Sequence, residues 1–302
     1  TIFVADIPMW TKNAELFSFA DDTTSVVSHA DLDAACELAT MDAERIMGFM
    51  TSNFLVANQD KTKLLIFDPN RSAESQAREI VIGGNVIVET TCEKLLGLHV
   101  SNDLRWTDHI QQTKTSLRYR ICMLKRLAHS LPHEHLRQLA DGLVLSKIRY
   151  GLAVYSSTVR TSEQDPIDGT IQTLEVVVND VMRIIEGVRR KDRVSIHELR
   201  KKTNVPSVNQ MAAQAIITDA WKIAHNKVAG LEDIFTQLNE AGMKTRAKTN
   251  GNFKVPFGSQ MIRRSFSHQG AVLWNALPQE IRESETIHSA KKKIRAHVQS
   301  YP

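Results

Sequence analysis

The stretch ELFSFADDTTSVVS, residues 15–28, carries phenylalanine, threonine and valine on both sides of an acidic pair, Asp21 and Asp22. Its weak alternation predicts a β-hairpin whose turn lies near Ala20–Asp22. Two carboxylates about 4 Å apart, at an effective dielectric near 20, repel each other by roughly 4 kcal/mol. A divalent cation removes this repulsion, because Mg²⁺ prefers hard oxygen ligands. For the dipeptide alone, the alternative is an exposed turn, where Asp is common.

The surrounding sequence predicts a small α+β unit. Asp31 is a suitable N-cap for a helix whose apolar residues follow at helical spacing: Leu32, Ala35, Ala39, Ala43, Ile46, Met47 and Met50. KTKLLIF (61–67) predicts a short buried strand, and EKLLGLHVS (93–101) predicts another. EIVIGGNVIVE (79–89) predicts a hairpin in which Gly83, Gly84 and Asn85 supply the positive φ of a tight turn.

After residue 105 the pattern becomes helical. Amphipathic helices are predicted at 107–129 and 133–149, which are separated by Pro132, and at 170–188, which stops at Gly187. Residues 207–230 predict a further helix, whereas 242–264 are polar and basic and predict a loop. The fold class is therefore α+β, with antiparallel hairpins and a helix followed by a mainly α-helical remainder.

Composition narrows the protein class. With 42% hydrophobic and 24% charged residues the chain is ordinary for a globular protein, and no run of about 18 apolar residues predicts a membrane span. Cys36, Cys92 and Cys122 lack metal-ligand spacing and suit a reducing compartment. Because the chain begins with Thr1, we expect a fragment of a longer protein.

The charge is distributed unevenly along the chain. Residues 1–110 hold 8 Lys and Arg against 17 Asp and Glu, a net charge of −9. Residues 111–302 hold 30 Lys and Arg against 17 Asp and Glu, a net charge of +13. This asymmetry favours a polyanionic partner for the C-terminal part, and the alternative is a solvated basic surface.

The acidic pair and several downstream blocks resemble one family. FSFADDTT (17–24) resembles the [FY]-A-D-D box of reverse transcriptases from jockey-like and related non-LTR retrotransposons. IFVADIP (2–8) resembles the stretch before this box, with Ala5 in place of the usual Asn. Further resemblances follow in the family's order: NQDKTKLLIF (58–67), EKLLGLHVSNDLRWTDHI (93–110), LVLSKIRYGLAVY (143–155) and SFSHQGAVLWNALPQEIRES (265–284).

The resemblance implies a metal site at the hairpin. Asp21 is the expected direct ligand of catalytic Mg²⁺, or alternatively Mn²⁺. Asp22 is expected either as a second ligand or as a residue that supports the site without touching the metal. Two such ions clamp the attacking and leaving oxygens during nucleotidyl transfer. The family's third carboxylate lies on a strand well upstream of the box. We therefore expect this chain to have no polymerase activity by itself and its sheet to have an unpaired edge.

The resemblance also implies roles near the primer. Phe19 occupies a box position near the primer terminus, and Lys61 matches a lysine proposed to protonate the departing pyrophosphate. Leu96 and Gly97, together with Leu98, fall on the family's primer-gripping hairpin, where glycine permits close approach to nucleic acid. The alternatives are a surface lysine at position 61 and a packing glycine at position 97.

The resemblance implies that the basic remainder corresponds to the family's thumb, which would straddle the template–primer duplex. Phosphate contacts of this kind need charge and reach rather than base readout. The candidates on one predicted helix are Lys114, Arg118, Arg120, Lys125 and Arg126. Other candidates are RRKDR (189–193), RKK (200–202) and the basic stretch 244–264.

The resemblance implies three regions: a partial palm at 1–105, a thumb-like helical region at 106–205, and a basic helical C-terminal region at 206–302. The intact enzyme would add dNTPs to a DNA primer on an RNA template. The alternative is a degenerate or domesticated transposon remnant that acts as a non-catalytic nucleic-acid-binding module. The family implies an intracellular location, nuclear or cytoplasmic, and no membrane. Neither the target site nor the oligomeric state follows from the sequence.

Overall fold

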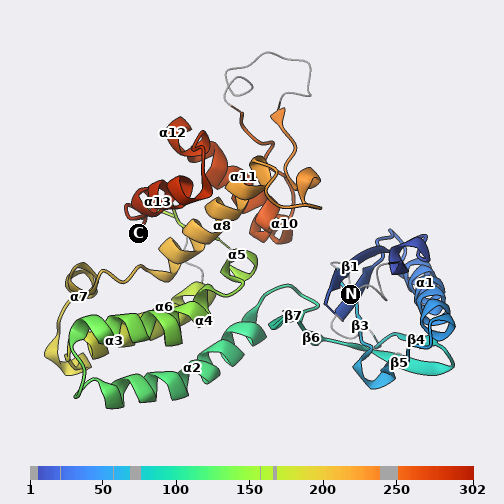
Figure 1. Cartoon of the computed structure of the whole chain (residues 1–302), viewed down its shortest axis with the longest axis horizontal. Coiled ribbons are helices and arrows are strands. Elements are labelled where there is room, and N and C mark those ends of the chain that lie inside the picture. Colours follow the sequence, from blue (N-terminus) through green and yellow to red (C-terminus); the bar gives the residue numbers. More distant parts are fainter. Residues whose placement is uncertain are drawn as a thin grey trace. The chain divides into compact units, whose positions relative to one another are not determined.

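The structure is a computed structural model that describes residues 6–20, 22–56, 58–68, 76–156, 158–165, 169–238 and 251–302. The chain divides into two compact units, Thr1–Leu104 and Arg105–Pro302. Within the described residues, the first unit contains three small sheets and one long helix, and the second is built mainly of helices (Figure 1). The predicted α+β class is therefore confirmed.

The predicted hairpin at the acidic pair forms as two five-residue strands. β1 (Glu15–Phe19) pairs antiparallel with β2 (Asp22–Val26), and Phe19 lies opposite Asp22. Among the described strands, β1 and β2 pair only with each other. An isolated two-stranded hairpin is marginally stable, so this element depends on contacts outside the sheet.

One helix covers a small sheet in the first unit. α1 (Leu32–Ser52) begins at Asp31, whose side chain accepts a 3.0 Å hydrogen bond from the Ala34 N–H, so the predicted N-cap is confirmed. The sheet has the order β3-β5-β4, with β5 (Asn85–Thr90) parallel to β3 and antiparallel to β4 (Glu79–Ile82). The core between them consists of Ile80, Ile82 and Ile87, packed against Cys36, Ala43, Met47 and Leu64.

Two details of the sheet differ from the prediction. The strand expected at 61–67 is short, because β3 comprises only Leu64–Leu65. In the β4–β5 turn Gly83 and Gly84 have positive φ, of 56° and 80°, but Asn85 is already part of β5. Asn85 contributes differently, since its Nδ2 donates a 3.1 Å hydrogen bond to the Gly83 carbonyl.

The single strand predicted at 93–101 is wrong. This stretch forms a hairpin of β6 (Cys92–Leu95) and β7 (Leu98–Ser101), with Leu95 opposite Leu98. Leu96 and Gly97 connect the strands with φ values of 46° and 84°. Two consecutive residues with positive φ are typical of a type I′ turn, which reverses the chain within two residues.

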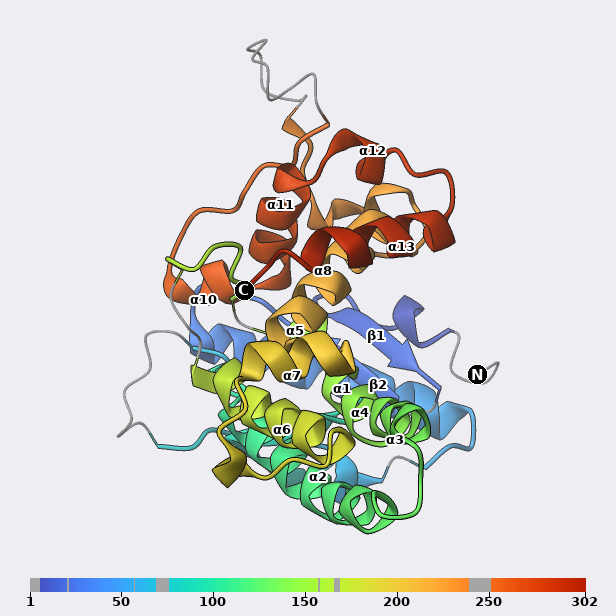
Figure 2. The same ribbon diagram turned by 90° about the vertical axis from the view of Figure 1, so that its left-hand side faces the viewer.

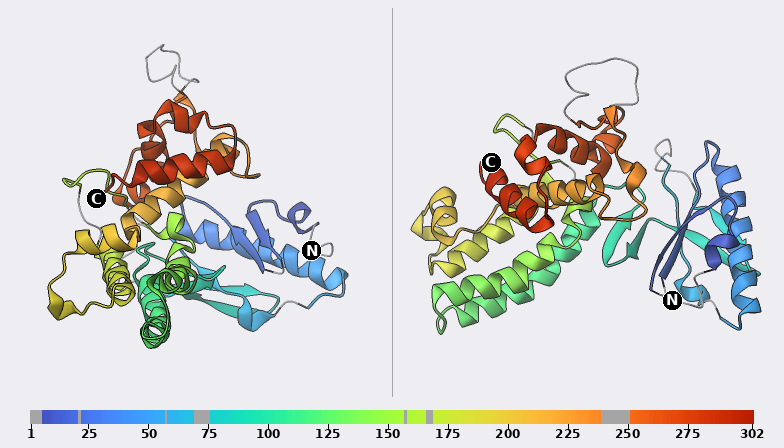
Figure 3. Two further views of the ribbon diagram at one scale, coloured as in Figure 1. Left: turned by 60° about the vertical axis from the view of Figure 1, so that its left-hand side comes forward. Right: turned by 45° about the horizontal axis from the view of Figure 1, so that its top comes forward.

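In the second unit three long helical segments lie side by side. α2 (Thr107–Leu127), α3 (His133–Ala140) and α6 (Gly169–Ile185) pack against one another, as the green and yellow helices of Figure 3 show. The predicted helices at 107–129 and 170–188 are confirmed, and Gly187 has a φ of 66° just beyond α6. Their apolar stripes, including Leu117, Leu124 and Leu174, are fully buried.

The helix predicted at 133–149 is present but irregular. α3 continues into the π-helical segment η4 (Asp141–Leu145) and then into α4 (Ser146–Arg149). A π-turn widens the helix by one residue per turn, so the residues on each side of it can face the core together. Leu136, Val144 and Ile148 are all buried there.

α8 (Val208–Ala224) forms the centre of the second unit. It packs against α4, α5 (Leu152–Tyr155), α6, α11 (Phe266–Ala276) and α13 (Ile287–Val298) (Figure 2). Its buried residues extend around most of its circumference, as expected for a helix enclosed by others. A capping box of Ser207 and Gln210 fixes its N-terminus.

The remaining elements are short. They are η2 (Ile7–Met9), η3 (Gln59–Lys61), η5 (Arg190–Asp192), α7 (Ile196–Thr203), η6 (Glu232–Ile234), α10 (Gln260–Arg264) and α12 (Gln279–Arg282). Of the loop predicted at 242–264, residues 242–250 lie outside the described residues, and α10 contradicts the prediction at its end. Among the described helices, none has the length and apolar character needed to cross a bilayer.

Candidate active site and nucleic-acid-binding surface

The tip of the β1–β2 hairpin carries the predicted metal ligands. Residues directly opposite each other in antiparallel strands point to the same face, so the side chains of Phe19 and Asp22 share one face. Ala20, in the turn, has a φ of 56°. Asp22 is exposed and Phe19 is 67% exposed, whereas Asp21 lies outside the described residues. One predicted ligand thus stands beside Phe19 in solvent.

A buried carboxylate that the sequence did not single out fixes the chain just before this hairpin. Asp42, in α1, is fully buried. Its Oδ2 accepts hydrogen bonds from the backbone N–H groups of Lys12, Asn13 and Ala14 at 3.1, 2.6 and 2.8 Å. The Arg45 guanidinium pairs with its other oxygen. Asp42 therefore attaches the segment that enters β1 to the covering helix.

The ionisation of Asp42 reflects this network. Burial by itself raises the pKa of the carboxyl, but the backbone donors Asn13, Lys12 and Ala14 and the Arg45 side chain outweigh burial and hold the pKa below its ordinary value of 3.8. The charged form is thus the stable one at neutral pH. A sequence signal for this role existed, because Asp42 lies on the apolar side of its helix, three residues after Ala39 and four before Ile46.

The described residues do not form a metal site among themselves. No group of three His, Cys, Asp or Glu side chains within the described ranges could hold a metal ion. Asp22 has the hard oxygen donors that suit Mg²⁺, but one carboxylate is too few for a two-metal centre. Magnesium at this hairpin thus requires Asp21 and further ligands.

Lys61 lies at the end of η3 and is exposed. The strand that follows, β3, joins β5 rather than the β1–β2 hairpin. The side chain is accessible to a ligand, but the structure does not bring Lys61 into the sheet that carries Asp22. Its catalytic role stays a prediction.

Leu96 and Gly97 form the turn of the β6–β7 hairpin. The positive φ of Gly97, 84°, is a conformation that glycine adopts at little cost, and this turn geometry explains the glycine locally. This turn requirement differs from both reasons that the sequence suggested for a glycine at position 97, which were close approach to nucleic acid and packing within a strand. Leu95 and Leu96 are 41% and 45% exposed, so the tip presents an apolar surface.

The predicted basic helix, α2, does present cations on one face. Lys114, Arg118 and Lys125 recur at i, i+4 and i+11, which places them on one side of the helix. Arg118 and Lys125 are exposed and Lys114 is half-buried. Arg126 is exposed beside Tyr119, which is itself 73% exposed. Within the described residues, no ion pair involves any of these four cations.

Arg120 is different from the other basic residues of α2. Its Nη1 donates a 2.8 Å hydrogen bond to the Leu143 carbonyl in the π-helical segment, so it joins two helices. Its position follows from the helical repeat, since Arg120 lies on the same side of α2 as the buried residues Thr113, Leu117 and Leu124. The prediction that Arg120 contacts phosphate is therefore not supported by its placement.

The other basic runs are partly used within the fold. Arg190 of RRKDR forms a bidentate pair with Asp180, at 2.7 and 2.9 Å from one guanidinium nitrogen. In RKK, Arg200 pairs with Glu175, and Lys202 pairs with Glu198 at 3.2 Å. Lys201 has no ion-pair partner among the residues that the structure describes, and it lines a cleft.

The distal block that contains Trp274 is a structural cluster. Trp274 is 5% exposed and stacks on Phe253 with a centroid separation of 5.2 Å, and its indole N–H donates to the Gly251 carbonyl at 3.0 Å. Asn275 accepts from the Phe253 N–H and donates to the Phe253 carbonyl, both at 2.8 Å. The side chain of Asn275 thus pairs with the backbone as a strand would.

Arg282 completes this cluster. Its guanidinium donates to the carbonyls of Leu277 and Asn275 and to Oδ1 of Asn252, at 3.0, 2.9 and 2.8 Å. It also lies 5.8 Å from the Trp274 ring centre. Burial lowers the pKa of Arg282, which remains charged at neutral pH. These residues therefore serve the fold of the C-terminal region.

No protein-family model, curated protein or solved structure matches this chain.

Proposed function

We propose that this chain is the C-terminal portion of a non-LTR retrotransposon reverse transcriptase, an RNA-directed DNA polymerase. In this proposal residues 1–105 form part of the palm, 106–205 the thumb, and 206–302 a basic C-terminal region. Asp21 and Asp22 would hold Mg²⁺ together with a third carboxylate from a preceding segment. The chain alone would therefore be inactive.

The observation that carries the proposal is the geometry of the hairpin tip. Phe19 lies directly opposite Asp22 across a two-residue turn, and both side chains stand in solvent on one face. Asp22, the described member of the acidic pair, is thus the first residue of β2, at the exposed end of the hairpin. Exposed Phe17 and Phe19, at 53% and 67%, leave an apolar surface on the same face, which suits an additional strand or a primer.

The basic face of α2 supports the nucleic-acid part of the proposal. Arg118, Lys125 and Arg126 are exposed cations without a carboxylate partner among the described residues, and Tyr119 on the same helix is an exposed aromatic residue. Contacts with a duplex backbone need charge and reach, which these side chains supply. The second unit also carries the positive excess of the chain.

The test is Asp21→Asn in the longer protein that includes the preceding segment. Primer extension on an RNA template with a DNA primer, dNTPs and Mg²⁺ should fall by about 10³-fold or more, because a metal ligand contributes several kcal/mol to transition-state stabilisation. Duplex binding, measured by fluorescence anisotropy, should stay within about twofold, since one side chain at the tip adds little to backbone contacts.

Glu15→Gln is the matched control, because it removes a carboxylate from the same hairpin at the end distant from the turn. It should leave extension unchanged. Extension that survives Asp21→Asn contradicts the metal assignment. Robust extension by residues 1–302 alone contradicts the need for a third carboxylate.

A second candidate is a non-catalytic nucleic-acid-binding module derived from such an element. The observation that favours it is that the basic face of α2 needs none of the hairpin carboxylates, and the described residues alone form no metal site. The same experiment separates the two functions. A longer protein that binds duplex but does not extend a primer, before any substitution, supports the module.

A further inference from the structure

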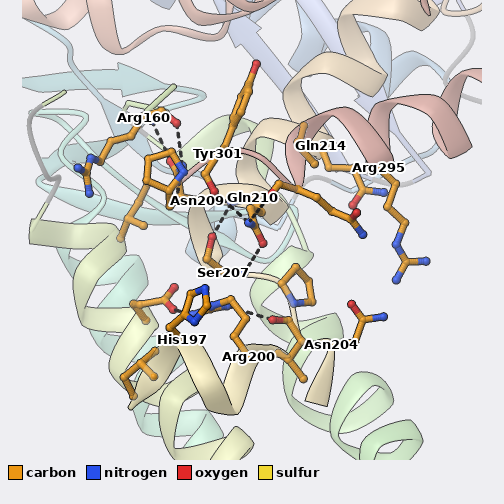
Figure 4. Close-up of a pocket in the computed structure, with 18 of the residues that line it drawn as sticks. Arg160, His197, Arg200, Asn204, Ser207, Asn209, Gln210, Gln214, Arg295 and Tyr301 are labelled. Carbon is orange, nitrogen blue, oxygen red and sulfur yellow. Dashed lines mark hydrogen bonds and ion pairs between the residues drawn. The ribbon is translucent and has the colours of Figure 1, made fainter. Parts of the chain in front are cut away.

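The second unit contains a cleft of about 720 Å³ that lies away from the α2 face. Its walls are α7, the N-terminal turns of α6 and α8, and the end of α13 with the residues that follow it (Figure 4). A volume of this size falls within the range of about 300–1,000 Å³ typical of ligand sites. We refer to it as the α7–α13 cleft.

The floor of the α7–α13 cleft is fixed by polar contacts. Asn209 accepts from the Arg160 N–H and donates to the carbonyls of Arg160 and Pro302, at 2.8, 2.8 and 3.0 Å. Gln210 donates to the Tyr301 carbonyl at 3.0 Å. These bonds join the chain end to α8 (Figure 4), so the walls of the cleft are held in place without a ligand.

The one carboxylate side chain among the described lining residues is already used. Glu175 pairs with Arg200, and its other oxygen accepts a 2.7 Å hydrogen bond from the Val208 N–H. The Arg160 guanidinium is also engaged, because it donates to the carbonyls of Asp165 and Glu163 at 3.0 and 2.8 Å. The charged groups of Glu175 and Arg160 therefore stabilise the fold through contacts within the chain.

Three basic side chains of the lining have no ion-pair partner within the described part of the chain: His197, Lys201 and Arg295. His197 and Lys201 stand one helical turn apart on the same side of α7, and Arg295 comes from α13. All three are exposed. An anion in the cleft would meet cations from two walls and no free carboxylate side chain among those described.

Amide side chains complete the lining. Gln172, Asn204, Gln214 and Gln299 all face the cleft, and each amide offers both donors and acceptors. Cations bind phosphates, whereas amides match the donor and acceptor edges of unpaired bases. A double helix keeps those edges in its grooves and is too wide for a cavity of this volume. A single strand can place phosphates and bases in it together.

We propose that the α7–α13 cleft binds a single-stranded segment of nucleic acid, with Lys201, Arg295 and His197 on its phosphates and the amide side chains on its bases. The ligand chemistry is a phosphodiester strand, RNA or DNA. The cleft shares no residue with the acidic hairpin or with the basic face of α2, and the proposal holds whether or not the protein is a polymerase.

The test compares two double variants of the whole chain that lose equal charge. Lys201→Gln with Arg295→Gln removes two cations from the cleft. Lys202→Gln with Lys292→Gln removes two exposed cations from the same two helices outside the cleft. Lys202 pairs with Glu198 at 3.2 Å, but exposed pairs of this kind contribute little to stability. Fluorescence anisotropy measures the affinity of each protein for short labelled single-stranded RNA, single-stranded DNA of the same sequence, and a duplex, over a series of salt concentrations.

The cleft variant should bind at least one single strand about tenfold more weakly, and its salt slope for that strand should fall by about 1.4 for two lost phosphate contacts. The strand with the larger loss identifies the ligand as RNA or DNA. The control variant should lose no more than about threefold, and duplex affinity should respond equally in both variants. Because all four positions are exposed, thermal unfolding monitored by circular dichroism should be unchanged.

Equal losses in the two variants would overturn the proposal, because the effect would then follow net charge alone. A larger loss for duplex than for single strands in the cleft variant would also overturn it. Neither result bears on the hairpin carboxylates, so failure here is distinguishable from failure of the polymerase assignment.

Discussion

The Phe19–Asp22 hairpin tip and the Trp274–Arg282 cluster are both sequence blocks that resemble the same family, yet the fold uses them in opposite ways. Phe19 is 67% exposed and Asp22 stands in solvent. Trp274 is 5% exposed, Asn275 exchanges two hydrogen bonds with Phe253, and Arg282 donates to Leu277, Asn252 and Asn275. The first block is therefore exposed and available to a ligand, whereas the second is part of the core of the second unit.

The same contrast separates the two compact units. In the first unit the described core is small and includes Ile80, Ile82 and Ile87 at 7–8% exposure, and hydrogen bonds such as those of Asp42 position its hairpin. In the second unit α8 is enclosed by helices, with Trp221 and Ile216 fully buried. Substitutions in the second unit should therefore lower stability mainly through lost packing. Substitutions in the first unit should lower it mainly through lost polar contacts and turns.

Trp274→Ala should produce the largest effect. It removes a buried indole that stacks on Phe253 and donates to the Gly251 carbonyl, so the free energy of unfolding of the second unit should fall by about 3–5 kcal/mol. Urea titration followed by circular dichroism measures this. Phe257→Ala, at a position 92% exposed in the same unit, should change it by less than about 0.5 kcal/mol. Similar losses of stability at the two positions would show that Trp274 does not contribute to the core of the second unit.

Asp42→Asn should produce an intermediate effect in the first unit. The substitution removes the charge that accepts three backbone N–H groups, and the free energy of unfolding should fall by about 2 kcal/mol at pH 7. Hydrogen exchange at the Asn13 and Ala14 amides should accelerate. Glu44→Gln, at an exposed position of the same helix, should leave both unchanged.

The pH dependence follows from the lowered pKa of Asp42. A carboxyl whose pKa is lower in the folded than in the unfolded state stabilises the fold above its unfolded pKa, near 3.8. That contribution is lost as the pH falls through the folded pKa. The wild-type protein should therefore lose stability more steeply than Asp42→Asn between about pH 5 and pH 2. If the free energy of unfolding of the two proteins falls equally steeply with pH in this range, Asp42 does not anchor the hairpin.

Gly97→Ala should produce the smallest loss of stability, and its effect should be opposite in sign to that of a glycine substitution in a helix. Gly97 has a φ of 84°, so alanine should destabilise the β6–β7 turn by about 1 kcal/mol. Gly48→Ala in α1 is the matched control: a Cβ there meets nothing within 4 Å, and alanine should stabilise the helix by about 0.5–1 kcal/mol. The same sign at both positions, in urea titrations, would contradict the assigned turn.

Local sequence patterns predicted the elements that depend mainly on neighbouring residues in the chain. Alternation around a polar turn predicted the 15–26 hairpin, helical spacing predicted α1, α2 and α6, and a capping aspartate predicted the start of α1. Lys114, Arg118 and Lys125 follow from the same repeat. The family resemblance implied a hairpin at 92–101, but the local pattern indicated one strand, because the turn contains Leu96, and leucine rarely adopts positive φ.

By itself, the sequence determined the α+β class, the hairpin that carries the acidic pair and the charged face of α2, because backbone geometry and side-chain periodicity act over a few residues. The partners of Asp42, Arg120 and Arg200, and the cleft between α7 and α13, became visible only in the folded structure. Those outcomes depend on burial and on partners between about 20 and 125 residues away in the sequence, and local propensity carries no information about such contacts.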